Sequence, residues 1–134
     1  MKIINRLYNK WPPETRKRLR SISLRSEGDM CKAIRHRPCD SFVVFHNGAI
    51  LGWAIYVLEP WYHDKMPGDF MIYVKKLWRR KGIGRALIKA GLAKYKNIRI
   101  HPWNENSGRF FSKIIKENKD IVIARGRAWL TIGD

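Results

Sequence analysis

The chain has 134 residues, and its 28 Lys and Arg against 11 Asp and Glu give a formal net charge of +17. This length is typical of one domain, and a hydrophobic content of 45% is enough for a packed core. No run approaches the roughly 20 apolar residues that cross a bilayer, and the N-terminus has no apolar segment of signal-peptide length, so we expect a cytoplasmic protein without a membrane span. The charge far exceeds the magnitude of about 2–8 that is usual for a small domain, which favours an acidic macromolecular partner.

Residues 1–40 form a basic, helical N-terminal part. Two helix starts are expected there, at Pro12–Thr15 and at Ser26–Asp29, and no strand is evident in Met1–Ile4. The two helices, or one broken helix, have narrow apolar faces and a broad Lys and Arg face. That face is equally consistent with a solvated surface and with nucleic-acid contact, because it lacks the interleaved aromatic residues that stack on bases.

Cys31 and Cys39 are eight residues apart. This spacing matches neither a C-x-x-C redox pair nor a paired set of metal ligands. We therefore expect reduced, structural thiols and no metal centre.

A β-hairpin follows the helical part. Ser41–Phe45 is expected to be a strand, Asn47-Gly48 supplies the positive φ angles of a tight turn, and Ala49–Leu58 is the returning strand. Gly52 within the second strand indicates a bulge or a close approach of another backbone. The loop that follows, up to Gly68, contains Trp61 and Tyr62, which either line a binding site or cover one end of the core.

The most informative stretch is Tyr73–Leu87, which joins the apolar strand Phe70–Val74 to a helix expected from Arg85 to about Lys94. Glycines 82 and 84 allow tight or left-handed backbone and let a ligand approach the main chain closely. The unpaired N–H groups and the positive dipole at a helix N-terminus favour a phosphate. Arginines 79, 80 and 85 and Lys81 add positive charge around this turn.

This turn resembles a known phosphate-binding signature. Arg79-Arg80-Lys81-Gly82-Ile83-Gly84 is similar to the R/Q-x-x-G-x-G/A motif of the GNAT superfamily of acyl-CoA-dependent N-acyltransferases, and it follows a strand, as it does in that family. The two other common phosphate loops do not fit, since the dinucleotide motif needs glycine at Leu87 and the P-loop needs Gly-Lys-Ser/Thr after a longer spacer.

A second resemblance lies towards the C-terminus. The strand Asn97–Ile100 is followed by a helix in which Asn104, Ser107, Phe110, Phe111 and Lys113 resemble the family's second motif. Two short strands, Ile121–Ala124 and Ala128–Ile132, complete the chain as a hairpin. The expected fold is therefore α/β, a single GNAT-like domain over residues 1–134 with a mixed sheet, in the order N-terminal helices and then β-β-β-α-β-α-β-β. The resemblance covers Ser41 to Ile132.

The resemblance implies acetyl-CoA as cofactor, with its pyrophosphate on the main chain of the loop and its pantetheine arm between the strands that end at Val74 and at Ile100. The main-chain N–H near Val74 is then suited to a developing oxyanion. The residues expected to contact the cofactor are Val74, Arg79, Arg80, Lys81, Gly82, Ile83, Gly84, Arg85, Asn104 and Phe111.

Acylation of an amine requires the neutral amine, although a free lysine-type amine has a pKa near 10.4, so a general base is expected. Glu59 and Asp69, at strand ends, are ranked ahead of His63, and each has a plain alternative as a solubilising side chain. The expected catalytic residues are Glu59, Asp69 and Val74. Phe111 stands where the family has a tyrosine that protonates the leaving thiolate, and Lys76 stands in place of a family proline.

Two functions are consistent with these residues. The first is an N-acetyltransferase acting on a primary amine of an acidic or nucleic-acid-associated acceptor, such as a protein or aminoacyl-tRNA. The alternative is a GNAT scaffold of weak or no activity that uses its basic surface to bind nucleic acid, tRNA or DNA, or an acidic protein. A small cationic amine is disfavoured as substrate because the positive charge would repel it. The sequence leaves the oligomeric state open.

Overall fold

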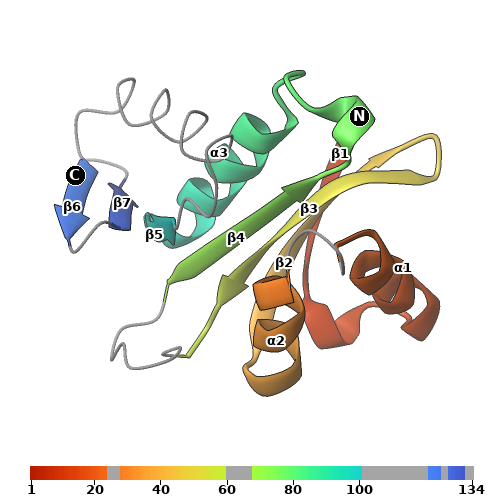
Figure 1. Ribbon diagram of the computed structural model, residues 1–134, viewed down its shortest axis with the longest axis horizontal. Coiled ribbons are helices and arrows are strands. Elements are labelled where there is room, and N and C mark those ends of the chain that lie inside the picture. The colour runs from red at the N-terminus through yellow and green to blue at the C-terminus, as the bar shows by residue number, and fades with distance from the viewer. Residues whose placement is uncertain (24–27, 60–67, 101–120, 125–126, 132–134) are drawn as a thin grey trace.

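The computed structural model describes residues 1–23, 28–59, 68–100, 121–124 and 127–131, and the remaining ranges lie outside this description (Figure 1). The strands are β1 (Lys2–Leu7), β2 (Cys39–His46), β3 (Ala49–Val57), β4 (Asp69–Val74), β5 (Asn97–Ile100), β6 (Ile121–Ala124) and β7 (Arg127–Thr131). The α-helices are α1 (Pro13–Ser23), α2 (Gly28–His36) and α3 (Ile83–Tyr95), and Tyr8–Lys10 and Lys76–Trp78 are 3-10 turns. None of these helices has the length and apolar character needed to cross a membrane.

The strands form one sheet in the order β1-β2-β3-β4-β5-β7-β6. All neighbouring pairs are antiparallel except β4 and β5, which are parallel. A parallel pair needs a crossover connection, and α3 supplies it. This mixed sheet with helices confirms the expected α/β fold.

The sheet starts with a strand that the sequence analysis did not anticipate. The edge strand β1 pairs antiparallel with β2, from Lys2↔Phe45 to Leu7↔Asp40. Its residues are mostly exposed, and Ile3 and Ile4 pack against opposite faces of the sheet. The segment therefore lacks the regular alternation of a half-buried strand, and its pairing with β2, more than 30 residues away, determines its structure.

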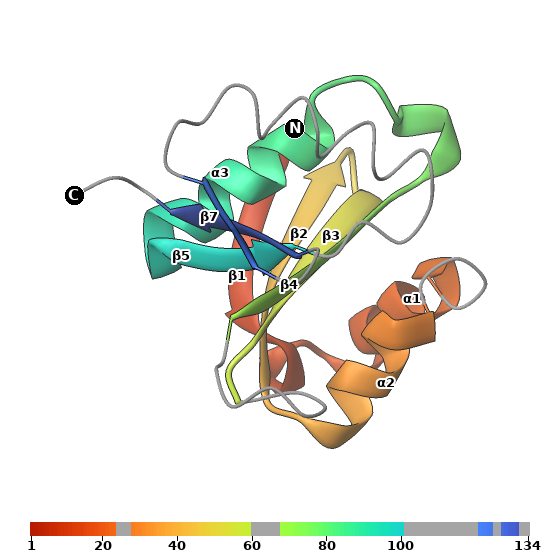
Figure 2. The same cartoon turned by 60° about the vertical axis from the view of Figure 1, so that its left-hand side comes forward.

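One face of the sheet packs against α3 (Figures 1 and 2). Its core joins side chains from β2, β3, β4 and β5 to one face of α3: Phe42, Val44, Leu51, Ala54, Tyr56, Phe70, Ile83, Leu87, Ile88, Leu92, Ile98 and Ile100. The helix lies close to the sheet at Gly91, where an added Cβ would be only 2.7 Å from the Phe70 ring. Packing, rather than backbone conformation, requires this glycine.

The opposite face packs against α1 and α2, as Figure 2 also shows. Its core consists of Tyr8, Trp11, Leu19, Met30, Ala33, Cys39, Val43, Ile50, Trp53, Ile55, Val57 and Met71. The two cores take alternate residues of the central strands, which are buried on both faces. The two N-terminal helices predicted from the sequence are confirmed, and each uses its narrow apolar stripe for this core.

The hairpin was predicted closely. Asn47 and Gly48 have φ angles of +50° and +79°, as the tight turn requires. The register shifts from Val44↔Gly52 to Phe45↔Ile50, so Leu51 is the extra residue of a bulge. A Cβ at Gly52 would lie 2.8 Å from the carbonyl oxygen of Tyr73, so both the bulge and the close approach are present.

Cys39 is buried, and burial, with a smaller contribution from the charge of Asp40, raises the pKa of its thiol to about 12. Such a thiol stays protonated and unreactive at neutral pH, which fits the structural role expected for it.

Candidate functional site

Helix α3 begins without a cap. Its N-cap residue is Gly82, with a left-handed φ of +83°, so no side-chain oxygen satisfies the first N–H groups, and the first turn contains no acidic residue. The first helical hydrogen bond is from Ala86 N to Gly82 O, at 3.0 Å. The N–H groups of Ile83 and Gly84 therefore have no acceptor one turn earlier in the helix and form a donor set for an anion, which the helix dipole further favours.

The space in front of this turn is open. An ideal Cβ at Gly82 would meet no atom within 4 Å, in contrast to the crowded Gly91 in the middle of the same helix. Arg80, two residues earlier, also has a positive φ, of +62°. Left-handed residues in such a turn direct N–H groups to one side and form an anion-binding concavity. The loop thus fits the phosphate group that the sequence pattern predicts for it.

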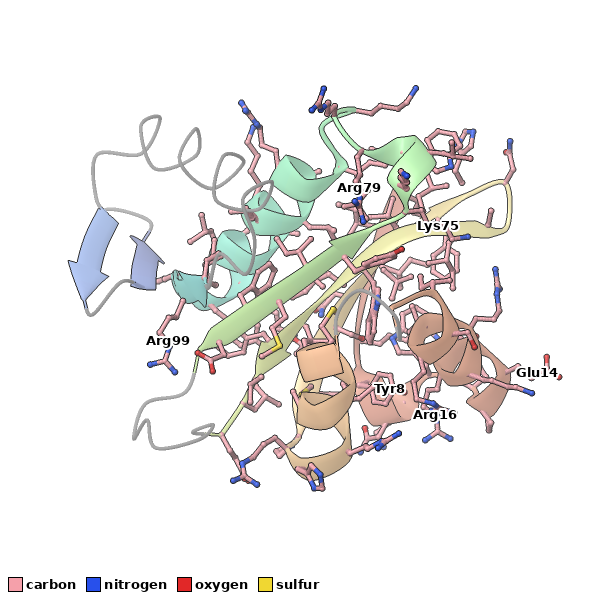
Figure 3. All side chains as sticks on the ribbon, viewed as in Figure 1. Tyr8, Glu14, Arg16, Lys75, Arg79 and Arg99 are labelled. Carbon is pink, nitrogen blue, oxygen red and sulfur yellow. The ribbon has the colours of Figure 1, made fainter. Side chains whose placement is uncertain are left out.

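Arg79 connects this loop to the end of β4. Its Nε donates to the carbonyl oxygen of Val74 at 2.9 Å, and its guanidinium lies 5.7 Å from the centroid of the Tyr73 ring. Figure 3 shows Arg79 at this end of the strand and Arg99 at the other end. The side chain is exposed, so its remaining N–H groups can reach a ligand at the loop.

The loop is uniformly basic. Between Asp69 and Glu105 the chain has no acidic residue. The Nζ of Lys81 lies 5.7 Å from the Trp78 ring, and Trp78 in turn lies 6.0 Å from His46 in the β2–β3 turn. Trp78 therefore fixes part of the loop against the sheet, while the cations around it face solvent. Lys75, Lys76, Arg79, Arg80, Lys81 and Arg85 are the cations of the loop and the first helical turn.

The edge of β4 that faces β5 is unpaired beyond its first residues in the part of the chain that the structure describes. Among residues 1–23, 28–59, 68–100, 121–124 and 127–131, β5 pairs with β4 only at Asp69↔Arg99 and Phe70↔Ile100, whereas β4 continues to Val74. On the other edge, Lys75 N donates to Leu51 O of β3 at 2.9 Å. Because N–H groups alternate in direction along a strand, those of Ile72 and Val74 point away from β3, towards the side of β5.

Arg79 lies on this same open edge, because the N–H and C=O of one strand residue point to the same side and Arg79 binds the Val74 carbonyl. The open edge of β4 thus runs directly into the donor set at the start of α3. An extended ligand arm can pair with the strand edge while its anionic group binds the helix. The N–H of Ile72 also points to this edge. Ile72 was not among the predicted site residues, because strand pairing, which the sequence does not show, decides which N–H groups remain at an unpaired edge.

Asp69 lies at the other end of β4. Its carboxylate is buried, with 2% of the residue exposed, and pairs with Arg99 Nε at 2.5 Å, while Arg99 is 3% exposed. Arg99 N also donates to Gly68 O at 2.8 Å. The ion pair therefore fastens β4 to β5 immediately before the open edge begins.

The structure does not bring Asp69 next to Val74, since the two residues are five steps apart along an extended strand, a distance of about 16 Å. Glu59 is exposed and follows β3 at this same end of the sheet, as the register Tyr56↔Phe70 requires. Asp69 shares the sheet face of Met71 and Tyr73, towards α1 and α2.

The structure brings together the loop residues Arg79 to Arg85 and Val74. Three other predicted site residues, His63, Asn104 and Phe111, lie outside the described residues. The described residues contain no cluster of three or more His, Cys, Asp or Glu side chains that could hold a metal ion.

Comparisons with known proteins agree with this geometry. Residues 2–115 match the model of the acetyltransferase (GNAT) family, a range that includes the unanticipated strand β1. No curated protein sequence matches the chain.

Solved structures share the fold at low sequence identity. The Bacillus subtilis N-acetyltransferase YlbP, in complex with coenzyme A, has 13% identity and a TM-score of 0.63, covering 98% of this chain and 96% of its own. A GNAT family acetyltransferase from Elizabethkingia anophelis with acetyl-CoA bound has 14% identity and a TM-score of 0.58, with coverages of 97% and 98%. An aminoglycoside acetyltransferase from an uncultured soil metagenomic sample, in complex with trehalose, has 18% identity and a TM-score of 0.58, covering 92% of each chain.

Proposed function

We propose that this chain, which belongs to the acetyltransferase (GNAT) family, is an acetyl-CoA-dependent N-acetyltransferase whose acceptor is a primary amine on an acidic or nucleic-acid-associated molecule. The observation that carries the cofactor assignment is the junction of an open strand edge with an uncapped, basic helix N-terminus. The enzymes of this fold with CoA or acetyl-CoA bound support the same assignment.

Different residues of the junction bind different parts of acetyl-CoA. The main-chain N–H groups of Ile83 and Gly84 hold the pyrophosphate, and Arg79 and Arg80 neutralise its charge. The open edge of β4 pairs with the pantetheine arm, and Asn104 adds a contact to it. Acetyl-CoA supplies an acyl group activated as a thioester.

The N–H of Val74 is placed to donate to the acyl oxygen as negative charge develops there. Such a preorganised donor contributes about 2.7–4 kcal/mol in other enzymes. Ile72, on the same edge, offers a second N–H of the same orientation two residues away.

The proton of the acceptor ammonium must leave before the amine can react. We assign the removal of this proton to Glu59 acting through a chain of waters, because Glu59 and Asp69 both lie at the end of β4 away from Val74, and Glu59 is exposed while the Asp69 carboxylate is held by Arg99. Asp69 then acts as a positioning residue that fixes the strands on either side of the open edge.

Glu59→Gln tests this assignment. We expect kcat/KM to fall about 100-fold, while the affinity for acetyl-CoA stays unchanged. Asp69→Asn is the comparison, and we expect it to weaken acetyl-CoA binding and lower the melting temperature. If Asp69→Asn lowered kcat about 100-fold with unchanged affinity for acetyl-CoA, and Glu59→Gln did not, the roles of the two residues would be reversed.

Two measurements test the function as a whole. Calorimetry should give micromolar affinity for acetyl-CoA, and absence of binding in this range would refute the enzyme assignment. Radiolabelled acetyl-CoA incubated with a lysate fractionated into protein, RNA and metabolites should label an acidic macromolecular fraction. Label confined to cationic metabolites would refute the acceptor class.

The net charge of +17 favours one alternative, a basic binding module without turnover. Phe111, at the position of the family's tyrosine, points the same way, because phenylalanine has no proton to donate. This alternative predicts retention on RNA that falls steeply with salt, as counterion release requires, and no acetyl transfer. Acetyl transfer to any acceptor rules it out.

A further inference from the structure

A hollow lies near the end of β4, on the sheet face that carries α1. It has a volume of about 250 Å³. Its lining comes from α1, from β3 and from the residue that follows β4: Lys17, Arg18, Ser21, Ile22, Ile50 and Lys75. This basic pocket is assembled from three segments that lie 25 or more residues apart in the sequence.

The floor of the basic pocket is apolar and held in place. Ile50 is buried and Ile22 is half-buried in the core between α1 and the sheet. Arg18 anchors α1 over the β2–β3 turn, since its Nη2 donates to Gly48 O at 3.0 Å. The pocket is thus a fixed part of the fold.

The walls of the basic pocket carry only positive charge. Lys17 and Arg18 are exposed and Lys75 is half-buried, and the described residues that line the pocket include no carboxylate. Arg18 has five N–H donors, of which one is used by Gly48, so the guanidinium can still bind an anion. Aliphatic stems beneath charged heads suit a ligand with an apolar part and an anionic group.

The pocket adjoins the reaction site. Lys75 follows Val74 directly, so the pocket wall starts one residue, or about 3.8 Å along the chain, from the N–H assigned to the acyl oxygen. Residues 71 and 73 face α1 and α2, and by alternation Lys75 faces the same way. Figure 3 shows Lys75 beyond the end of β4, close to Arg79 and on the α1 side.

We propose that the basic pocket binds a phosphate group of the acceptor, with the adjoining apolar segment of the acceptor on Ile22 and Ile50, and so presents the amine to the end of β4. This inference rests on the proposed function. Phosphate is favoured over carboxylate because it carries more charge and more acceptor oxygens for three cations that include an arginine. A cationic acceptor is disfavoured for the same reason.

The first experiment locates the ligand without relying on catalysis. We choose 6-aminohexyl phosphate, which has an amine, an apolar chain and a phosphate, and 6-aminohexanol, which lacks the phosphate. With the full chain in saturating CoA, the phosphate probe should shift the ¹³C methyl resonances of Ile22 and Ile50, and 6-aminohexanol should not. Unshifted methyl resonances with the phosphate probe overturn the inference.

The second experiment measures selectivity. In the wild type, kcat/KM for 6-aminohexyl phosphate should exceed that for 6-aminohexanol at least tenfold. Lys17→Gln/Lys75→Gln should reduce this ratio to near one, while Lys89→Gln, which removes an exposed charge on α3, should leave the ratio unchanged. An equal ratio in all three proteins overturns the inference.

A third arm identifies the source of the phosphate. An RNA 12-mer with a 5′-aminohexyl phosphodiester is compared with 6-aminohexyl phosphate. Preference for the RNA assigns a nucleic-acid acceptor, and equal or lower activity assigns a free phosphorylated amine. A glutamate-rich peptide with one lysine that exceeds both would overturn the phosphate assignment. Methyl shifts without transfer to any acceptor would refute the proposed function and leave the pocket as a phosphate site.

Discussion

The two ends of α3 differ in how their polar groups are satisfied. At the N-terminus, the N–H groups of Ile83 and Gly84 have no acceptor one turn earlier in the helix, the cap is a glycine, and the charged residues next to it in the sequence are all positive. At the C-terminus, Lys94 and Tyr95 both bind the carboxylate of Asp40, which is fully buried. One end is left open to a ligand, and the other is closed by the protein itself.

The C-terminus of α3, here called the closed end, is held by an extensive network of side-chain contacts. Lys94 Nζ lies 2.6 Å from Asp40 Oδ2, Asn5 Nδ2 donates to Asp40 Oδ1 at 2.8 Å, and Tyr95 stacks on Tyr56 with ring centroids 3.7 Å apart. The network ties α3 to β1, β2 and β3. A cation in the last turn also complements the negative end of the helix dipole. Together these contacts hold the helix in place against the sheet, so that its N-terminus stays in position at the end of β4.

We expect substitutions at the N-terminus of α3, the open end, to affect ligand binding, and substitutions at the closed end to affect stability.

Gly82→Glu is expected to cause the largest loss of affinity for CoA. A side chain at φ +83° is strained, and a carboxylate in the anion site repels the pyrophosphate. We expect the affinity for CoA to fall by about 1,000-fold, equivalent to ~4 kcal/mol, in calorimetry.

Gly48→Glu is the matched control. Gly48 has a similar φ of +79° and also has open space at its Cβ, but it lies in the β2–β3 turn. The two variants therefore suffer similar backbone strain and carry the same added charge. If both variants lost affinity for CoA equally, backbone strain or net charge would explain the loss. The assignment of the α3 N-terminus as the pyrophosphate site would then fail.

Asp40→Asn tests the closed end. Removing the charge leaves Lys94 and Tyr95 facing an amide, and the amide N–H groups conflict with donors from Asn5 and from the Ser41 backbone. We expect the free energy of unfolding to fall by about 3 kcal/mol, with no change in the Kd for CoA. Urea denaturation measures the free energy of unfolding, and calorimetry measures the Kd for CoA.

Glu14→Gln removes the same charge from an exposed position on α1 and should cost about 0.5 kcal/mol or less. A weakened affinity for CoA in a folded Asp40→Asn protein would show that the two ends of the helix are coupled, contrary to the comparison.

The open end was predictable from the sequence because its signals are local. Glycine at 82, cations on either side of it and an apolar strand before it are all within 15 residues, and the structure places Arg79 and Val74 in contact as that order requires. The hairpin at Asn47-Gly48 was predictable for the same reason. Local chemistry determines both turns.

The closed end was not predictable, because its members are 35 to 55 residues apart. Nothing near Asp40 in the sequence indicates that Lys94 will reach it. The basic pocket, the ion pair of Asp69 with Arg99 and the strand β1 have the same origin, since each arises only when distant segments meet in the sheet. The sequence therefore identified the glycine-containing loop before α3, and it gave no indication of the basic pocket.

The smallest expected effect is a dependence of stability on pH at the closed end. Burial alone would raise the pKa of Asp40, but hydrogen bonds from Lys94, Tyr95 and Asn5 and the charge of Lys94 together hold the pKa below its ordinary value of 3.8. A carboxyl group with a lowered pKa in the folded state stabilises the protein above the unfolded-state pKa, and this contribution is lost as pH falls through the folded-state value.

We therefore expect the free energy of unfolding to decrease from about pH 5 downwards, and to decrease less steeply in Asp40→Asn than in the wild type or in Glu14→Gln. Urea titrations at intervals from pH 6 to pH 3 measure the three slopes.

The affinity for CoA is the control. Over the part of this pH range where the wild type stays folded, the affinity should follow the ionisation of CoA and be the same in all three proteins. The reason is that Asp40 lies at the C-terminus of α3, whereas CoA is proposed to bind at the N-terminus. Equal slopes for the wild type and Asp40→Asn would show that Lys94 and Tyr95 do not stabilise the ionised carboxylate, and the closed end would then have to be explained by packing of Tyr56 on Tyr95 alone.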